Sequence, residues 1–60
     1  MFIKLTPVEI CQNSDFIYVA GRDISFMERI RKEYTLISIK NYGIVNVKET
    51  PQEIMALLSD

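Results

Sequence analysis

Residues 35–53 have the sequence TLISIKNYGIVNVKETPQE, and this stretch decides most of the fold. Residues 35–40 and 44–48 are two runs rich in β-branched side chains, which favour strands. Residues 41–43 lie between them, and Gly43 is placed for the left-handed position of a bulged hairpin. The stretch therefore predicts an antiparallel hairpin. The side chains expected to face inward are Thr35, Ile37, Ile39, Val45 and Val47.

The end of the same stretch predicts the start of a helix. The hydroxyl of Thr50 can accept a hydrogen bond from the N–H of Glu53, and the carboxylate of Glu53 can accept one from the N–H of Thr50, which together make a capping box. Pro51 suits the first helical position, where its missing N–H would have no partner. Because a helix of about nine residues is marginal alone, we expect it to dock on the sheet. Its apolar stripe consists of Ile54, Leu57 and Leu58.

The first part of the chain predicts further strands. Residues 2–5 are rich in strand formers, and residues 8–11 are expected to continue the strand after Pro7, which suits an edge or a bulge because it cannot donate a hydrogen bond. Residues 12–15 are polar and have strong turn chemistry. Residues 16–20 (FIYVA) predict a strand that is apolar on both faces, so each face needs a cover.

Residues 24–33 are compatible with two structures. As a strand, they place Ile24, Phe26 and Ile30 on one face, with Glu28 interrupting the alternation. As a helix, they have an aspartate in front to act as the N-cap and an internal pair of opposite charges four positions apart. Local propensity favours the helix.

These elements predict an α+β fold: a small antiparallel β-meander of four to five strands with one C-terminal α-helix, in a single domain of residues 1–60. A chain of this size buries only about 60% of the surface that its unfolded form exposes, so its own core is marginal. Small domains commonly add disulfides, a metal or a partner chain. Cys11 is the only cysteine, which excludes an internal disulfide, and there is no histidine. We therefore predict a homo-oligomer, with a dimer as the first choice.

The composition argues against catalysis. Histidine, the usual general base near neutral pH, is absent, so Cys11 has no imidazole to activate it. A single cysteine without histidine cannot supply the four ligands of a structural zinc site. The chain has two glycines and no glycine-rich phosphate loop. We therefore expect no enzyme activity, no cofactor and no metal.

Membrane insertion is not expected either. No run of 18 apolar residues is present, and the first residues are not expected to act as a signal peptide, because they lack its pattern of a basic start and a long apolar stretch. A lone thiol fits a reducing compartment, so the expected location is the cytoplasm.

The stronger functional signal is an excess of apolar side chains. A single short helix can cover only one face of a small sheet, and large exposed apolar patches mark interaction sites. We predict a protein-interaction or assembly module that associates with itself. The candidate residues for this contact are Phe16, Tyr18, Phe26 and Met27.

A basic cluster offers an alternative function. Arg29, Arg31 and Lys32 are the candidate nucleic-acid contacts, because such binding rests on neutralising phosphates. Glu28 and Glu33 interrupt the cluster, and the whole chain has a formal net charge of −1. Nucleic-acid binding is therefore possible but is not the favoured hypothesis.

Three stretches carry a family resemblance. Residues 3–6 (IKLT) open the pattern, residues 35–43 form the hairpin with its glycine turn, and residues 47–54 (VKETPQEI) lead into the helix. This pattern resembles the FlbD-type family of small proteins linked to flagella and swarming motility, and similar short bacterial and phage proteins. The resemblance implies a β-meander plus helix, a strand for residues 24–33 and no known catalytic residues. The role that we expect is that of an accessory or regulatory protein in a bacterial or phage cell. We adopt the strand for residues 24–33.

Overall fold

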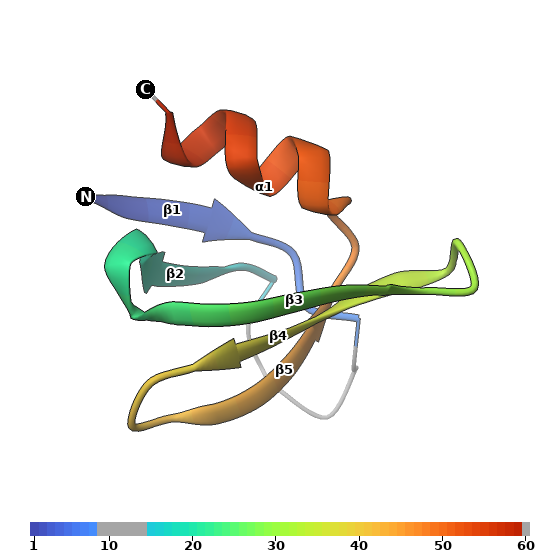
Figure 1. Ribbon diagram of the computed structural model, residues 1–60, viewed down its shortest axis with the longest axis horizontal. Coiled ribbons are helices and arrows are strands. Elements are labelled where there is room, and N and C mark those ends of the chain that lie inside the picture. Colours follow the sequence, from blue (N-terminus) through green and yellow to red (C-terminus); the bar gives the residue numbers. More distant parts are fainter. Residues whose placement is uncertain (9–14, 60) are drawn as a thin grey trace.

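The computed structural model describes residues 1–8 and 15–59, and it confirms the predicted α+β fold (Figure 1). Residues 24–30 form a strand and not a helix. Cys11 and most of the predicted continuation over residues 8–11 lie outside the described residues. In chain order the elements are β1 (Phe2–Leu5), β2 (Ile17–Ala20), the short 3-10 helix η1 (Gly21–Asp23), β3 (Ile24–Ile30), β4 (Tyr34–Ile39), β5 (Gly43–Val47) and α1 (Pro51–Leu58).

The strands form two antiparallel sheets, and the chain passes from the first to the second through η1, after β2. One sheet contains β1 and β2, and the other is the meander β3–β4–β5. Beyond β1, Pro7 pairs with Val47, and the N–H of Val8 donates to the carbonyl of Asn46 at 2.9 Å. The N-terminal segment thus leaves the first sheet and follows the edge of β5 in the second.

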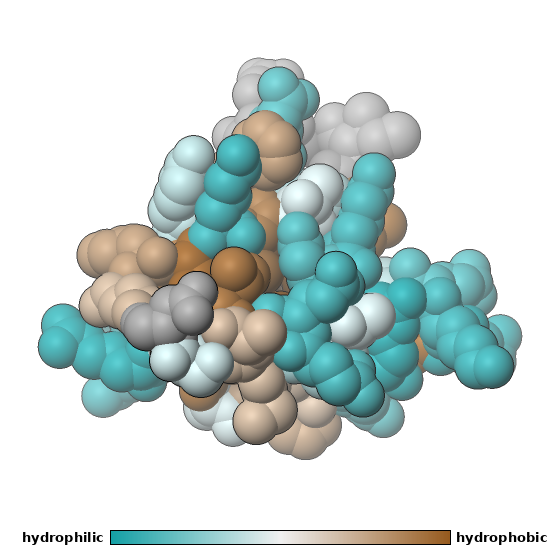
Figure 2. All heavy atoms as spheres, turned by 90° about the horizontal axis from the view of Figure 1, so that it is seen from above, coloured by the Kyte–Doolittle hydropathy of each residue, from teal (hydrophilic) through white to brown (hydrophobic). Residues whose placement is uncertain are grey.

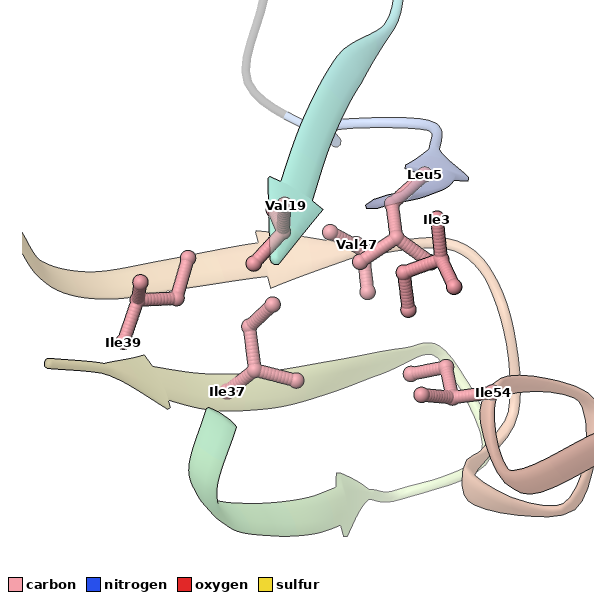
Figure 3. Close-up of a cluster of buried hydrophobic side chains, with 7 residues drawn as sticks. All are labelled: Ile3, Leu5, Val19, Ile37, Ile39, Val47 and Ile54. Atoms are coloured by element: carbon pink, nitrogen blue, oxygen red, sulfur yellow. The ribbon is translucent and has the colours of Figure 1, made fainter. Parts of the chain in front are cut away.

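The inner sides of the two sheets share one aliphatic core (Figure 3). Alternate residues of β1 and β4 point into it, as the period of two in a strand requires. The helix contributes Ile54, which is fully buried. The buried hydrophobic residues are Ile3, Leu5, Val19, Ile37, Ile39, Val47 and Ile54.

The helix docks through a narrower stripe than predicted. Ile54 is buried and Leu58 packs against the core, but Leu57 is 37% exposed. Leu58 lies directly over Gly21, where a Cβ atom would overlap its Cδ2 atom. The helix therefore contacts the core through Ile54 in its middle and Leu58 at its C-terminal end, and the prediction that Leu57 belongs to the buried stripe is wrong.

The predicted capping box is confirmed. The N–H of Thr50 donates to Glu53 Oε1 at 2.9 Å, the N–H of Glu53 donates to Thr50 Oγ1 at 3.1 Å, and Pro51 occupies the first turn. The Thr50 backbone N–H, followed by the Thr50 side chain and the charge of Arg29, holds the pKa of Glu53 below its ordinary value of 4.5. The charged form of this exposed carboxyl group therefore favours the folded state.

The broken alternation in β3 is a β-bulge. Ile24 and Met27 both pack on the core although they are three positions apart, because Ser25 is an extra residue in the pairing with β4. The hydroxyl of Ser25 donates to a β4 carbonyl at 3.3 Å. The prediction that Ile24 shares a face with Phe26 and Ile30 is therefore wrong: the latter two follow the bulge and point outward.

In the β4–β5 turn, the left-handed residue is Asn41 and not Gly43 as predicted. A hydrogen bond from the N–H of Tyr42 to the carbonyl of Ile39 closes the turn at 3.1 Å. Asn41 takes the left-handed conformation, with φ at 66°, whereas Gly43 has φ at 123°. Asparagine tolerates the left-handed region better than most residues, and the φ of Gly43 is one that side chains rarely adopt.

Candidate interaction surfaces

The outward side of β1 and β2 carries exposed aromatic rings. Phe2 is 70% exposed, Tyr18 is 65% exposed and Phe16, just before β2, is 43% exposed. The Nζ atom of Lys4 lies 4.0 Å from the centre of the Phe16 ring, a cation–π contact. Lys4 also pairs directly with Tyr18 across the two strands. A charged group thus occupies the middle of this surface, which we name the hairpin face.

The outward side of the second sheet, which we name the meander face, has an apolar centre. Pairing across the three strands places its side chains in rows. Leu36 stands in the middle, half-buried, while Phe26 and Ile44 are 53% and 67% exposed. Asn46 Oδ1 is buried here and has no hydrogen-bond partner among the described residues. The rows are Phe26–Ser38–Ile44, Glu28–Leu36–Asn46 and Ile30–Tyr34.

The structure separates the four residues predicted for self-association. Phe16 and Tyr18 lie on the hairpin face, and Phe26 lies on the meander face. Because both sheets turn their inner sides to the same core, these two faces point away from each other. Met27 lies on the inner side, where it packs against the core and is only partly exposed.

None of the three phenylalanines belongs to the core. They are exposed by 43–70%, and the buried hydrophobic side chains of the described residues are all aliphatic. Figure 2, seen from the side of α1, shows apolar atoms gathered over the middle and left of the molecule. Hydrophilic side chains gather at the right, where the β3–β4 turn projects in Figure 1.

The basic cluster is also divided. Arg29 lies on the inner side of β3, opposite the fully buried Thr35. Its Nη1 atom donates to Thr35 Oγ1 at 3.2 Å and to the carbonyl of Lys48 at 3.3 Å, and its Nη2 atom donates to the carbonyl of Lys32 at 2.8 Å. The guanidinium group of Arg29 therefore joins β4, the end of β5 and the β3–β4 turn.

Arg31 and Lys32 form the exposed tip of the β3–β4 turn. Both have positive φ, at 50° and 63°, and a hydrogen bond from the N–H of Glu33 to the carbonyl of Ile30 closes the turn at 2.9 Å. Two consecutive positive φ angles are typical of a type I′ turn, where Asn-Gly is preferred. The turn is thus strained, and the contact of Arg29 with the Lys32 carbonyl holds it in place.

Glu49 is a structural residue that the sequence did not single out. Its two carboxylate oxygens accept hydrogen bonds from the N–H of Thr6 at 2.9 Å and from the hydroxyl of Thr6 at 2.8 Å. The contact fixes the point where the N-terminal segment passes from the first sheet to the second. Thr6 and Glu49 are 43 positions apart, so no local pattern could have indicated it.

Among residues 1–8 and 15–59, no three His, Cys, Asp or Glu side chains come together in a way that could hold a metal ion. In this part of the chain, no helix has the length and apolar character needed to cross a membrane. Comparison of the chain with protein-family models, with curated proteins and with solved structures gave no match.

Proposed function

We propose that the chain is a non-enzymatic protein-interaction module that associates with itself, most simply as a dimer. The observation that carries the proposal is the position of the three phenylalanines, all of which are outside the core. Phenylalanine is among the residues most often fully buried in folded proteins. Among the described residues, the buried hydrophobic side chains are all aliphatic and the phenylalanines are exposed, so the phenylalanines offer apolar surface to another chain.

The distribution of these rings also favours association. Aromatic residues are enriched at protein–protein interfaces, where charged residues are depleted from the centre. On the meander face, Phe26 and Ile44 are exposed on either side of Ser38, and Leu36 occupies the middle of the next row, between Glu28 and Asn46. The resemblance to FlbD-type proteins is consistent with a role as an accessory or regulatory factor in a bacterial or phage cell.

Sedimentation equilibrium of the unmodified chain tests the proposal. A contact between two small faces lies at the low end of interface sizes, where association is weak. The chain should therefore be studied at concentrations from about 10 to about 500 µM. We expect the average mass to rise from 7.0 kDa, the mass of one chain, toward twice that value. Association through apolar side chains should persist when sulfate is added, since excluded salts strengthen apolar burial.

A mass of one chain throughout this range would contradict the proposal. Dissociation on adding salt would contradict it in another way, because it would indicate contacts between exposed charges, which salt screens.

A further inference from the structure

We infer that the second copy of the chain binds the meander face, around a two-fold axis that runs along β4 and passes through Leu36. The inference rests on the proposed self-association and adds its surface and its geometry. Symmetric two-fold dimers are the commonest homo-oligomers, and each uses the same patch on both subunits. The patch must therefore be complementary to itself.

The meander face satisfies this condition in one orientation. If the axis runs along β4, each residue of β3 faces a residue of β5 in the partner copy. Phe26 then faces Ile44, and Glu28 faces Asn46, whose amide N–H groups can donate to a carboxylate. Leu36 faces its own copy at the centre. In these two rows, the apolar and the polar residues thus find suitable partners.

The other in-plane orientation does not satisfy it. If the axis ran across the strands, each strand would face its own copy in the partner, and Glu28 would face Glu28 of the other copy. Two carboxylates brought together in a partly desolvated contact repel each other. Packed sheets cross at about 30°, which shifts the rows only slightly and leaves this difference intact. Charge therefore selects the axis along β4.

The hairpin face is the less suitable surface. It consists of two strands of four residues each, and the charged Lys4 stands at its centre, in contact with the Phe16 ring. Self-association there would bury an ammonium group that already has its partner. The meander face has three strands, and its central residue, Leu36, is uncharged, with Glu28 on the neighbouring strand.

Substitutions on the two faces test the inference, with the dissociation constant of the full chain measured by sedimentation. Leu36→Lys should weaken association by at least about tenfold, because two like charges would meet on the axis. Tyr18→Lys places the same charge on the hairpin face and should change the constant by no more than about twofold.

Asn46 tests the direction of the axis. With the axis along β4, Asn46→Lys faces Glu28 of the partner, and each dimer gains two ion pairs, which should tighten association by about two- to fivefold. Asn46→Glu should weaken it. With the axis across the strands, Asn46 would face its own copy, so both variants would weaken association.

The outcomes are distinguishable. If the unmodified chain dimerises but Leu36→Lys has no effect, the inference is wrong and the proposed self-association stands. If Asn46→Lys weakens the dimer, the axis is wrong. If the unmodified chain stays a monomer, the proposed function itself fails. Circular dichroism of each variant at low concentration checks that it folds. If Asn46→Lys does not fold, Glu28→Lys combined with Asn46→Glu, which places the same two opposite charges on exchanged strands, replaces it.

Discussion

The inward-facing and outward-facing residues of β4 belong to the same central strand but have different surroundings. Thr35, Ile37 and Ile39 point inward and are buried, whereas Leu36 and Ser38, their neighbours, point outward and are only partly covered. Both sides carry a large aliphatic residue at the centre, Ile37 on one and Leu36 on the other. The inner side holds the two sheets together, and among residues 1–8 and 15–59 the outer-side residues Leu36 and Ser38 are not part of that core. We therefore expect the inner side of this sheet to contribute more to folding stability than the outer side.

The largest expected effect separates Ile37 from Leu36. Ile37 is fully buried, so Ile37→Ala should lower the free energy of unfolding by about 3 kcal/mol through lost burial and a cavity. Leu36→Ala should lower it by less than about 1 kcal/mol when measured at low protein concentration, since the side chain is partly exposed already. Urea denaturation measures both. Equal losses would show that the outer side supports the fold as much as the inner side does.

A second test compares two arginines that are close in sequence. Arg29 donates three hydrogen bonds on the inner side, whereas Arg31 is exposed on the turn. Arg29→Met keeps most of the aliphatic stem and should lower the free energy of unfolding by about 1.5 kcal/mol, because the bonds to Thr35, Lys48 and Lys32 are lost. Arg31→Met should change it by less than about 0.5 kcal/mol. Thermal unfolding that shows no difference between the two variants would contradict the bracing role of Arg29.

The third test concerns the strained turn outside the core. Lys32 has φ at 63°, a conformation that glycine adopts without the strain of a side chain. Lys32→Gly should therefore raise the free energy of unfolding by about 0.5 kcal/mol, the net of relieved strain and the greater freedom of glycine in the unfolded chain. Glu33→Gly is the matched control and should lower it, because Glu33 is not among the described residues with positive φ. Denaturation midpoints of the two variants should move in opposite directions.

The smallest expected effect lies at the exposed end of the helix. Because folding lowers the pKa of Glu53, its carboxylate stabilises the folded state above pH 4.5, and this contribution is lost as the pH falls through the lowered pKa. Glu53→Gln should therefore show a flatter decline of stability below pH 4.5 than the unmodified chain. Gln52→Ala, the neighbouring uncharged position, should keep the original decline. Thermal melts between pH 2 and pH 7, compared among the three chains, provide the measurement; identical profiles would mean that the capping box does not depend on charge.

The parts of the fold that local patterns specify were predictable from the sequence. The β4–β5 hairpin follows from its β-branched residues, and the helix start at Pro51 follows from the spacing of Thr50 and Glu53. These signals depend only on residues within a few positions of each other, so they can be recognised from the sequence alone. The same holds for the strand over residues 17–20, whose inner and outer sides both carry apolar residues.

The remaining features depend on contacts that no local pattern contains. The bulge at Ser25 reverses which residues of β3 face outward, and this reversal moved Met27 to the inner side and left Phe26 outside. Arg29 looked like a member of a basic surface cluster because its acceptors lie on other elements. The division of the predicted self-association residues between two faces likewise required the pairing of the strands, which the sequence alone did not determine.

Chemical cross-linking across the proposed axis tests the central claim most directly. With Cys11→Ser removing the only native thiol, Leu36→Cys places one thiol at the centre of the meander face, and Tyr18→Cys in the same background places one on the hairpin face. We predict that a short bis-maleimide links two Leu36→Cys chains into a covalent dimer, that an excess of the Cys11→Ser chain suppresses this product, and that the Tyr18→Cys chain stays largely unlinked. Efficient linking of the Tyr18→Cys chain, with none at position 36, would contradict the account.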